Sequence, residues 1–343
     1  MKVQYFTDKE NIEDNALKCL EHFEQESNIE KITVFPDIHY CSEKAIPVGV
    51  SFKTKDVFYP LITGKDMGCG VAYLKIDKKD YLKRFDKDVH YRAFEKESYT
   101  MTDEGLGGGN HFLSIEESDK YLYIIVHTGS RNLGIYMYQQ NYSLLQEHNP
   151  GNEWLPIEYA DEKYRTEYQR ILDYAVKRRK EFLEKSFNFL SRNGYIKSPH
   201  YIIHDSCHNL LSFNDGSIIH HKGSTELIKD PIVIPLSMSR GSLIVSPQPY
   251  NLEESLASCS HGAGRRLGRT DTLKYWHSMK RSEKESYKKR FSELLNRSGE
   301  FDSSIIQEFD FAYKDSESIL KTQAHITKLD ETTPVVTVKF TGV

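Results

Sequence analysis

The chain has 343 residues, of which 28% are charged and 38% hydrophobic, a composition typical of a folded globular protein and not of a disordered one. Its net charge is −4, so no overall basic field attracts nucleic acid, and any such contact must be a local patch. No apolar run approaches the ~18 residues needed to span a bilayer, and the first residues lack a signal-peptide core, which together predict a cytoplasmic protein without membrane contact.

The first predicted elements are one helix and a series of short strands. Apolar residues at helical spacing predict an amphipathic helix that begins near Asp8 and carries Ile12, Ala16, Leu17, Leu20 and Phe23. Runs rich in β-branched and aromatic residues then predict strands at 32–35, 48–52, 57–59, 71–74 and 121–126.

A long amphipathic helix is predicted between residues 158 and 190. It carries the basic run 177–180, which we expect to form a solvated face. Further strand-like runs occur at 201–203, 217–219, 232–234 and 243–245. A second charged helix is predicted from the capping-box sequence at 282–285, and a last strand is predicted over 334–340.

The order of these elements favours an α+β fold. Strands and helices alternate without the regular rhythm of a parallel α/β sheet, and no Pro/Gly/Ser-rich linker divides the chain. We therefore predict one domain over residues 1–343, with a helical insertion at about 158–192.

Histidines follow strand-like runs and lie beside glycine or small polar residues in several places. A single histidine in such a place is more often structural than functional, but a repeated pattern indicates a site, because the backbone at glycine turns approaches ligands closely. The histidines in this setting are His39, His111, His127, His208, His220, His221 and His261.

Two glycine-rich segments suggest ligands. Asp66 and Cys69 offer a carboxylate and a thiolate on one turn, which suits a divalent transition metal once imidazoles complete the ligand set. A buried cysteine acting as a small hydrophobic residue is an equally good interpretation of this turn. The loop 105–109 is either a phosphate-binding loop or a glycine-rich hairpin without a ligand.

His261 and Arg265 stand four residues apart among small residues. Such a pair suits nucleophilic attack on phosphorus by the imidazole and a bidentate contact from the guanidinium to a phosphate. Close packing of a helix start on a strand explains the small residues equally well. The cysteines provide no further signal, because the five of them include no C-x-x-C pair, which argues against a disulfide framework and a zinc ribbon.

Taken in order, these motifs resemble the RtcB family of RNA ligases. The matching segments are PDIH (36–39), DMGCG (66–70), GGGNHF (107–112), HTGSR (127–131), HN (208–209), HHKG (220–223), PLSM (235–238), SCSHGAGR (258–265) and AYKD (312–315). The resemblance implies mixed or antiparallel sheets and an enzyme that uses GTP and two manganese ions. Its partner would be RNA, such as tRNA halves or cleaved RNA, whose 3′-phosphate or 2′,3′-cyclic phosphate end it joins to a 5′-hydroxyl end.

The resemblance also assigns roles to residues. Cys69 would bridge the two manganese ions, with His127 and His208 on one ion and Asp66 and His111 on the other. His261 would attack the α-phosphorus of GTP and become guanylylated, and Tyr313 would stack on guanine. Asp37 and His39 would lie just outside this set and in contact with it. The remaining nucleotide-binding residues would be Asn110, Asn209, Ser237, Gly262, Ala263, Gly264 and Arg265, and the candidates for RNA phosphate contacts are Arg131, Lys222, Arg240, Arg265, Arg266 and Arg269.

The chain departs from the family pattern mainly on the nucleotide side. Ser114 stands where the family has a glutamate expected to read guanine, with Glu116 as a substitute, and Leu236 and Ser239 stand where glycines are usual. The loop after His39 lacks its glycines, and the chain ends at 341–343 without the terminal Lys-Gly that contacts the base. These departures leave two alternatives: a relative that binds RNA ends without ligating them, and a two-metal cyclic phosphodiesterase.

Overall fold

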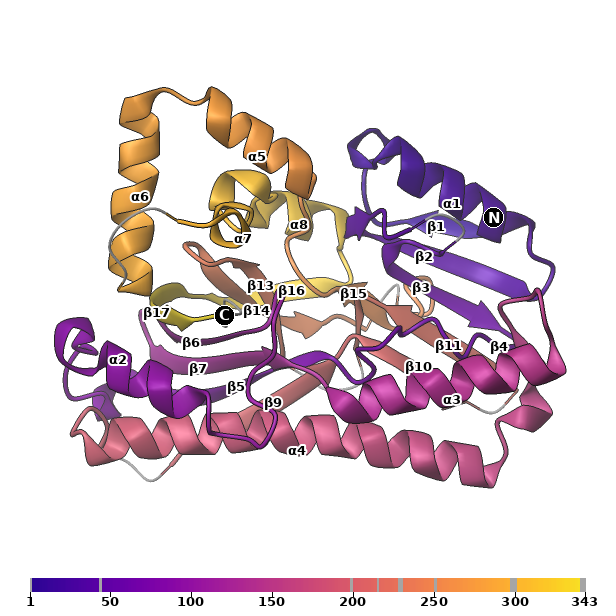
Figure 1. Ribbon diagram of the computed structural model, residues 1–343, viewed down its shortest axis with the longest axis horizontal. Helices are drawn as coiled ribbons and strands as arrows, with labels where there is room; N and C mark the ends of the chain where they lie inside the picture. Colours follow the sequence, from indigo (N-terminus) through magenta and orange to yellow (C-terminus); the bar gives the residue numbers. More distant parts are fainter. Residues whose placement is uncertain are drawn as a thin grey trace.

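Two five-stranded sheets form the centre of the computed structural model, which describes residues 2–42, 45–197, 200–214, 216–227, 231–249, 252–296 and 301–339 (Figure 1). The first sheet has the order β1 (Val3–Tyr5), β2 (Ile29–His39), β3 (Val48–Thr54), β11 (Ser217–Lys222) and β10 (Asn209–Asn214). The second has the order β17 (Thr333–Val338), β6 (Phe112–Glu117), β7 (Tyr121–Thr128), β5 (Gly70–Asp77) and β9 (Ile202–Cys207).

Three smaller sheets complete the described strands. They are β13 (Ile232–Ser237) with β14 (Gly241–Pro247) and β16 (Ile326–Glu331), β12 (Ser224–Glu226) with β15 (Ser258–Ser260), and β4 (Val57–Phe58) with β8 (Leu155–Pro156). Within the described strands β1 and β2 run parallel and the other pairs are antiparallel. The predicted α+β class with mixed and antiparallel sheets is therefore confirmed.

Helices cover the outer faces of these sheets (Figure 1). The α-helices are α1 (Asp14–Gln25), α2 (Lys87–Ser98), α3 (Asn132–His148), α4 (Glu162–Arg192), α5 (Arg269–Ser278), α6 (Arg281–Leu295), α7 (Ser303–Ile306) and α8 (Ser316–Thr322). Short 3-10 turns are η1 (Lys9–Asn11), η2 (Lys78–Asp80), η3 (Ile157–Tyr159) and η4 (Asp310–Ala312). None of the helices in the described ranges has a stretch long and apolar enough to cross a bilayer.

The long helix α4 joins two separate apolar cores. Tyr168 and Ile171, in its first half, pack into the core beneath the first sheet. Phe182 and Leu183, in its second half, pack into the core beneath the second sheet, together with α2. The middle of α4 therefore lies where the two cores meet, and this is also where the two sheets bring their functional residues together.

The predicted elements agree with the structure where the apolar pattern is strong. The long helix predicted over 158–190 is α4, and the strand predicted over 334–340 is β17, with residue 340 outside the described residues. The first helix begins later than predicted, because residues 9–11 form the turn η1. The helix predicted from 282–285 begins at Arg281, and its capping contact runs from the Lys280 backbone N–H to the Glu283 carboxylate at 3.0 Å.

Candidate metal centre and nucleotide cavity

Neighbouring strand ends of the second sheet carry the predicted metal ligands. Cys69 directly precedes β5, whose first residue, Gly70, pairs with Thr128 of β7 on one side and Cys207 of β9 on the other. His127 therefore lies beside Cys69, and His208, which follows β9, lies on the opposite side of it. His111 directly precedes β6, whose first residue pairs with His127.

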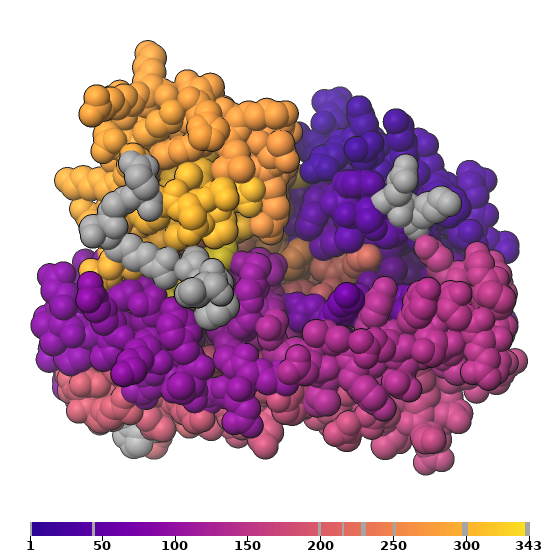
Figure 2. Space-filling model, in the orientation of Figure 1, coloured from indigo at the N-terminus to yellow at the C-terminus, as the bar shows by residue number. Residues whose placement is uncertain are grey.

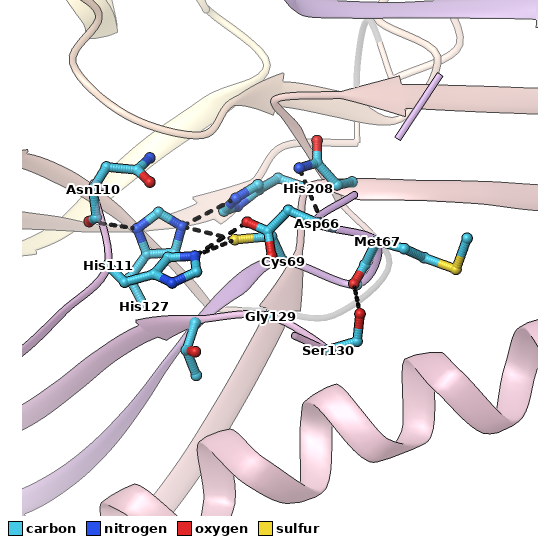
Figure 3. Close-up of polar contacts among 12 residues, drawn as sticks. Asp66, Met67, Cys69, Asn110, His111, His127, Gly129, Ser130 and His208 are labelled. Atoms are coloured by element: carbon cyan, nitrogen blue, oxygen red, sulfur yellow. Dashed lines mark hydrogen bonds and ion pairs between the residues drawn. The ribbon is translucent and has the colours of Figure 1, made fainter. Parts of the chain in front are cut away.

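The ligand atoms of these residues converge on the Cys69 sulfur (Figure 3). Cys69 Sγ lies 3.1 Å from His127 Nε2 and 3.4 Å from His111 Nε2. His127 Nε2 lies 3.2 Å from His208 Nε2, and His111 Nε2 lies 3.1 Å from Asp66 Oδ2. Two ligands of one tetrahedral ion at 2.0–2.3 Å would be about 3.4 Å apart, so these spacings and this mixture of sulfur, nitrogen and oxygen fit a transition-metal centre.

The electrostatics of the cluster favour neutral imidazoles. Burial lowers the pKa of His127 and His208 well below the ordinary value, and the neighbouring imidazoles lower both further. The Nδ1 atom of His127 lies 3.2 Å from the Asn110 carbonyl oxygen, to which it donates in the neutral ring, so that the Nε2 lone pair faces Cys69. Burial raises the pKa of the Cys69 thiol, and the Asp66 carboxylate raises it further. A bound cation is what would offset this cost of forming the thiolate.

Asp66 is an anion in this site. Burial acts to raise its pKa, but the hydrogen bond with His111 and the electrostatic attraction to the neighbouring rings outweigh burial and lower the pKa of Asp66 to about 2. Gly129 makes room for this carboxylate, because a Cβ at Gly129 would lie 2.3 Å from Asp66 Oδ1. A larger residue at position 129 would displace the carboxylate from His111.

The basic run 177–180 is not the solvated face that its charges predict. Lys177 and Lys180 are exposed, but Arg178 and Arg179 are buried, with 2% and 0% of their surfaces accessible. Arg179 binds Asp205 through two hydrogen bonds of 2.6 and 2.8 Å. The Asp205 carboxylate therefore offsets the free-energy cost of burying the charge of Arg179.

These two arginines hold the turns that carry the metal ligands. Arg179 Nη1 donates to the carbonyl oxygens of Gly68 at 2.7 Å and Thr128 at 2.9 Å, the residues next to Cys69 and His127. Arg178 Nη1 donates to Gly129, and its Nη2 donates to Gly105 of the glycine-rich loop. The middle of α4 thus fixes the loops around the cluster from below.

His261 lies beside the cluster and is held by Asp37. The His261 ring centroid is 4.7 Å from that of His208, and its Nδ1 is 2.5 Å from Asp37 Oδ2. The same carboxylate oxygen accepts hydrogen bonds from the backbone N–H groups of His261 and Gly262, at 2.8 and 3.2 Å. Burial lowers the pKa of His261, but the Asp37 carboxylate outweighs it and raises this pKa above the ordinary value.

The turn after His261 approaches Asp37 too closely for any side chain at Gly264. Gly264 has a φ of +71°, and a Cβ there would lie 2.4 Å from the Asp37 Cα. His39, also expected near the site, lies beneath this turn, with its Nδ1 2.9 Å from the Asp37 carbonyl oxygen. Close backbone approach therefore explains the glycine at position 264, whereas a Cβ at Gly262 would make only an ordinary contact with the Pro235 carbonyl oxygen, at 3.5 Å.

A cavity of about 160 Å³ opens on the far side of His261. It brings together most of the predicted nucleotide-binding residues, namely Asn110, Ser237, His261, Gly262, Ala263, Gly264, Arg265 and Tyr313, together with His127, Asp37 and His39. Ser237 Oγ is buried and has no hydrogen-bond partner among the described residues, so it is available to a ligand.

Asn209 does not line this cavity. Its Oδ1 accepts a hydrogen bond of 2.9 Å from the Gly223 N–H, and its Nδ2 donates to the Asp66 carbonyl oxygen at 3.4 Å. Asn209 therefore connects two turns beside the cluster.

Arg265 lines the cavity, but protein atoms already occupy its donors. Its Nη1 donates to the Tyr313 hydroxyl at 3.1 Å, and its Nη2 donates to Thr272 Oγ1 at 3.0 Å and the Gln307 carbonyl oxygen at 2.6 Å. Its Nε donates to the Leu267 carbonyl oxygen at 3.0 Å. The guanidinium thus fixes the cavity wall that holds Tyr313, in place of the free phosphate clamp that the motif predicts.

The inner end of the cavity contains two carboxyl groups and an ammonium group. Glu116 is 3% exposed and accepts hydrogen bonds from Ser114 and Thr332, so Ser114 serves Glu116 and does not itself line the cavity. Burial raises the pKa of Glu116, opposed by these hydroxyl donors.

Lys339 and Glu308 form a cavity wall that the sequence motifs did not reveal. Lys339 Nζ lies 3.6 Å from Glu308 Oε2, and the same glutamate accepts a hydrogen bond from the Tyr313 hydroxyl. Lys339 directly follows β17, whose run of β-branched residues predicts a strand but does not show what lies beside its end. The predicted loss of a C-terminal lysine contact concerns residues 341–343, which lie outside the described residues, whereas Lys339 provides an ammonium group in the cavity.

The basic side chains predicted to contact RNA phosphates do not lie together. Arg131 borders a second cavity beside Asp66 and His111, and Arg269 lines the nucleotide cavity. Arg240 and Arg266 line a surface groove on the other side of Tyr313. Lys222 lines none of these three, and burial lowers its pKa.

Comparison with known proteins agrees with the resemblance. Residues 75–340 match the family model described as tRNA-splicing ligase RtcB. The chain is similar to RNA-splicing ligase RtcB2 of Escherichia coli, with 26% identity covering 96% of this chain and 93% of that protein. It is also similar to RNA-splicing ligase RtcB1 of the same bacterium, at 25% identity over 87% of each chain. The tRNA-splicing ligase RtcB of Nanoarchaeum equitans is 25% identical over 63% of this chain and 54% of its own length.

The family match covers most of the chain and includes His111, His127, His208 and the His261 turn, whereas Asp37, Asp66 and Cys69 lie before its first residue. This protein therefore belongs to the RtcB family.

Proposed function

We propose that this protein is an RNA ligase that joins a 3′-phosphate or 2′,3′-cyclic phosphate end to a 5′-hydroxyl end, in tRNA splicing or in repair of cleaved RNA. The family match and the names of the similar proteins support RNA ligation. The chemistry of the ends, the use of GTP and the metal identity are what the resemblance to the family implies.

The proposed metal centre uses the converging ligands. Cys69 would serve both of two manganese ions, with His127 and His208 on one and Asp66 and His111 on the other. Neighbouring atoms of this set lie 3.1–3.4 Å apart, as expected for atoms that bind the same ion. Divalent ions in such a site neutralise phosphate charge and orient attacking and leaving oxygens.

His261 is the proposed nucleophile. In the neutral ring, Nδ1–H donates to Asp37, which leaves the Nε2 lone pair for attack on the α-phosphorus of GTP. A P–N bond forms, the P–O bond to pyrophosphate breaks, and the guanylyl group remains on His261. The Asp37 carboxylate stabilises the positive charge that develops on the ring during this attack.

The observation that carries this proposal is the place of His261 between the two parts of the site. Its ring packs 4.7 Å from the proposed ligand His208 and also lines the nucleotide cavity. A histidine held by a carboxylate at the junction of a candidate metal cluster and a cavity suits nucleotidyl transfer better than any role confined to one of them.

The base would bind at the inner end of the cavity. We propose that Tyr313 stacks on guanine, while the Glu116 carboxyl and the Lys339 ammonium contact its edge. All three line the cavity, and Glu116 and Lys339 are each less than a tenth exposed. These two residues would replace the base contact that Ser114 does not provide.

A labelling experiment tests the proposal. The purified protein is incubated with Mn²⁺ and GTP labelled on the α-phosphate, and the adduct is located by mass spectrometry. We expect one guanylyl group on His261, lost in His261→Ala and retained in His277→Ala, which removes an exposed histidine of α5. No adduct with any nucleoside triphosphate would contradict the proposal.

Product analysis on RNA with a cyclic phosphate end separates the alternatives. Joined RNA supports ligation. Release of an unjoined 3′-phosphate would indicate a phosphodiesterase, and end-dependent binding without any product would indicate a binding protein that does not ligate.

A further inference from the structure

The metal cluster borders a second cavity, separate from the nucleotide cavity. This cavity, of about 230 Å³, is lined by Lys65, Asp66, Gly108, Asn110, His111, Arg131 and Ile135. Asn110 lines both cavities, so the two meet at the cluster. If the nucleotide occupies the first cavity, the second is where another reactant reaches the same ligands. This step rests on the proposed function.

Helix α3 continues outward from this second cavity. Arg131 is its N-terminal cap residue, and Ile135, Tyr138 and Tyr142 follow at spacings of three and four residues, which places them on one side of the helix. Ile135 is 38% exposed and Tyr142 is 51% exposed, whereas Met137 and Asn141 of the neighbouring face are buried. Ile135 and Tyr142 therefore face solvent, and Tyr138 between them is partly exposed.

The stripe connects to the cavity through Lys65. The Lys65 Nζ lies 5.8 Å from the centre of the Tyr138 ring, and Lys65 itself lines the cavity. The Nε of Arg131 is buried and has no hydrogen-bond partner among the described residues. Both cations are thus at the end of the stripe nearest the metal ligands. Figure 2 shows a hollow at the centre of the visible face whose lower rim is the purple to magenta part of the chain.

The charge of α3 fits a polyanion. Residues 132–146 contain no Asp, Glu, Lys or Arg, in a chain that is 28% charged. Carboxylates would repel a phosphate backbone, and the helix has none over this stretch, although Glu104, which accepts a hydrogen bond from the Asn132 N–H, and Asp66 lie at its N-terminal end. Exposed aromatic rings beside a few cations are what proteins use to hold single-stranded nucleic acid, because bases stack on the rings and phosphates meet the cations.

We propose that α3 binds the single-stranded RNA next to the reacting end, with Tyr138 and Tyr142 stacking on its bases and Lys65 and Arg131 contacting its phosphates. The stripe from Ile135 to Tyr142 spans seven residues, or about 10 Å at the rise of an α-helix. RNA ends with an unpaired stretch therefore bind more tightly than ends that are paired up to the last nucleotide.

The test measures binding of RNA ends of two lengths by fluorescence anisotropy. One single strand of about 12 nucleotides reaches the stripe, and one of about three nucleotides occupies only the metal end. The variants are Tyr138→Ala/Tyr142→Ala and the control Tyr136→Ala, which removes a tyrosine that is 46% exposed on the other side of α3. We expect the double variant to weaken binding of the long strand about tenfold, with no change for the short strand, and the control to bind as wild type does.

Two further variants separate a loss of RNA contacts from a loss of folding. Tyr138→Phe/Tyr142→Phe keeps the rings and should restore binding, and Tyr142→Ala alone should weaken it if the double variant does not fold. If wild type forms the guanylyl adduct or joins RNA, but the alanine variants bind the long strand normally, the stripe is not an RNA surface and the ligase proposal stands. The same conclusion follows if the variants change only self-association of the chain, measured by sedimentation. If wild type neither forms the adduct nor binds either strand, the proposed function itself fails.

Discussion

The metal cluster and the nucleotide cavity meet at His127 but are built differently. In the cluster, ligand atoms face one another at 3.1–3.4 Å, and carbonyls next to the ligands are held by Arg179. In the cavity, Ser237 Oγ and Asp37 Oδ1 are buried without hydrogen-bond partners among the described residues. In the cluster, therefore, protein contacts alone fix the positions of the candidate metal-binding atoms. In the cavity, buried polar atoms are left to form hydrogen bonds with a bound molecule.

Removing the central sulfur should break the cluster side completely. We expect Cys69→Ser to lose bound metal and to lower guanylylation at least about 1,000-fold, because a hydroxyl does not replace a thiolate ligand. Metal content by mass spectrometry and the labelling assay measure this. The matched control is Cys207→Ser, at the same end of the sheet, where the thiol donates to the Cys69 carbonyl oxygen and a hydroxyl can do the same. Equal metal content in both variants would mean that Cys69 is not a ligand.

Removing the buried arginine should weaken the support of the cluster. Arg179→Met leaves the Asp205 carboxylate without its cation and two carbonyl oxygens without donors, so the free energy of unfolding should fall by about 3–5 kcal/mol. Urea denaturation measures this change. The control Lys180→Met removes an exposed lysine that pairs with Glu184 and should change stability by less than about 1 kcal/mol. If both variants lost the same unfolding free energy, residues 177–180 would form the solvated face that the sequence predicts.

Asp37 lies where the two sides meet, and its substitution should change both rate and pH dependence. Asp37→Asn removes the carboxylate that raises the pKa of His261, so this pKa falls. The nucleophile must be neutral, and its pH–rate curve should therefore move to lower pH, while the maximum rate falls about 100-fold because the ring loses its orientation. Single-turnover labelling across pH measures both. If the pH–rate curve of Asp37→Asn does not move, a group other than His261 determines the pH dependence of guanylylation.

The smallest effect is expected at the inner end of the cavity. Glu116→Gln removes a carboxyl that we assign to base recognition, and should reduce the preference for GTP over ATP about tenfold with little change in metal content. Competition between the two labelled nucleotides measures the preference. Ser239→Ala, which changes a neighbouring hydroxyl outside the cavity lining, is the control. An unchanged preference in Glu116→Gln would place base recognition elsewhere.

The sequence predicts much of the fold because apolar periodicity is local. Helix α4 and strands β3, β5, β7 and β17 each carry an apolar pattern that is readable without their neighbours. Helix α3 was missed, because the exposed Ile135, Tyr136 and Tyr142 blur the contrast between its faces. Paired segments such as β12 and β15 have three residues each, and only tertiary contacts make them strands.

The site is less predictable than the fold for the same reason. Motif residues such as Cys69, His127 and His261 are recognisable because their types and spacing carry chemistry. Arg179 was misjudged, because a sequence displays its charge and not the carbonyl oxygens that it binds. Lys339 was missed, because its place in the cavity depends on where β17 pairs with β6. The contacts of Arg265 were not predictable either, because they depend on which acceptors the fold places around its guanidinium.

The way α4 spans both apolar cores has a consequence for how the molecule unfolds. Its two halves belong to different cores, and its middle holds the backbone of the turns that carry the proposed metal ligands. Opening either core would release those turns, so the two halves should melt together and not as independent units. Amide hydrogens near Arg179 would then exchange only through global unfolding, and occupancy of the centre would protect the whole chain from proteolysis.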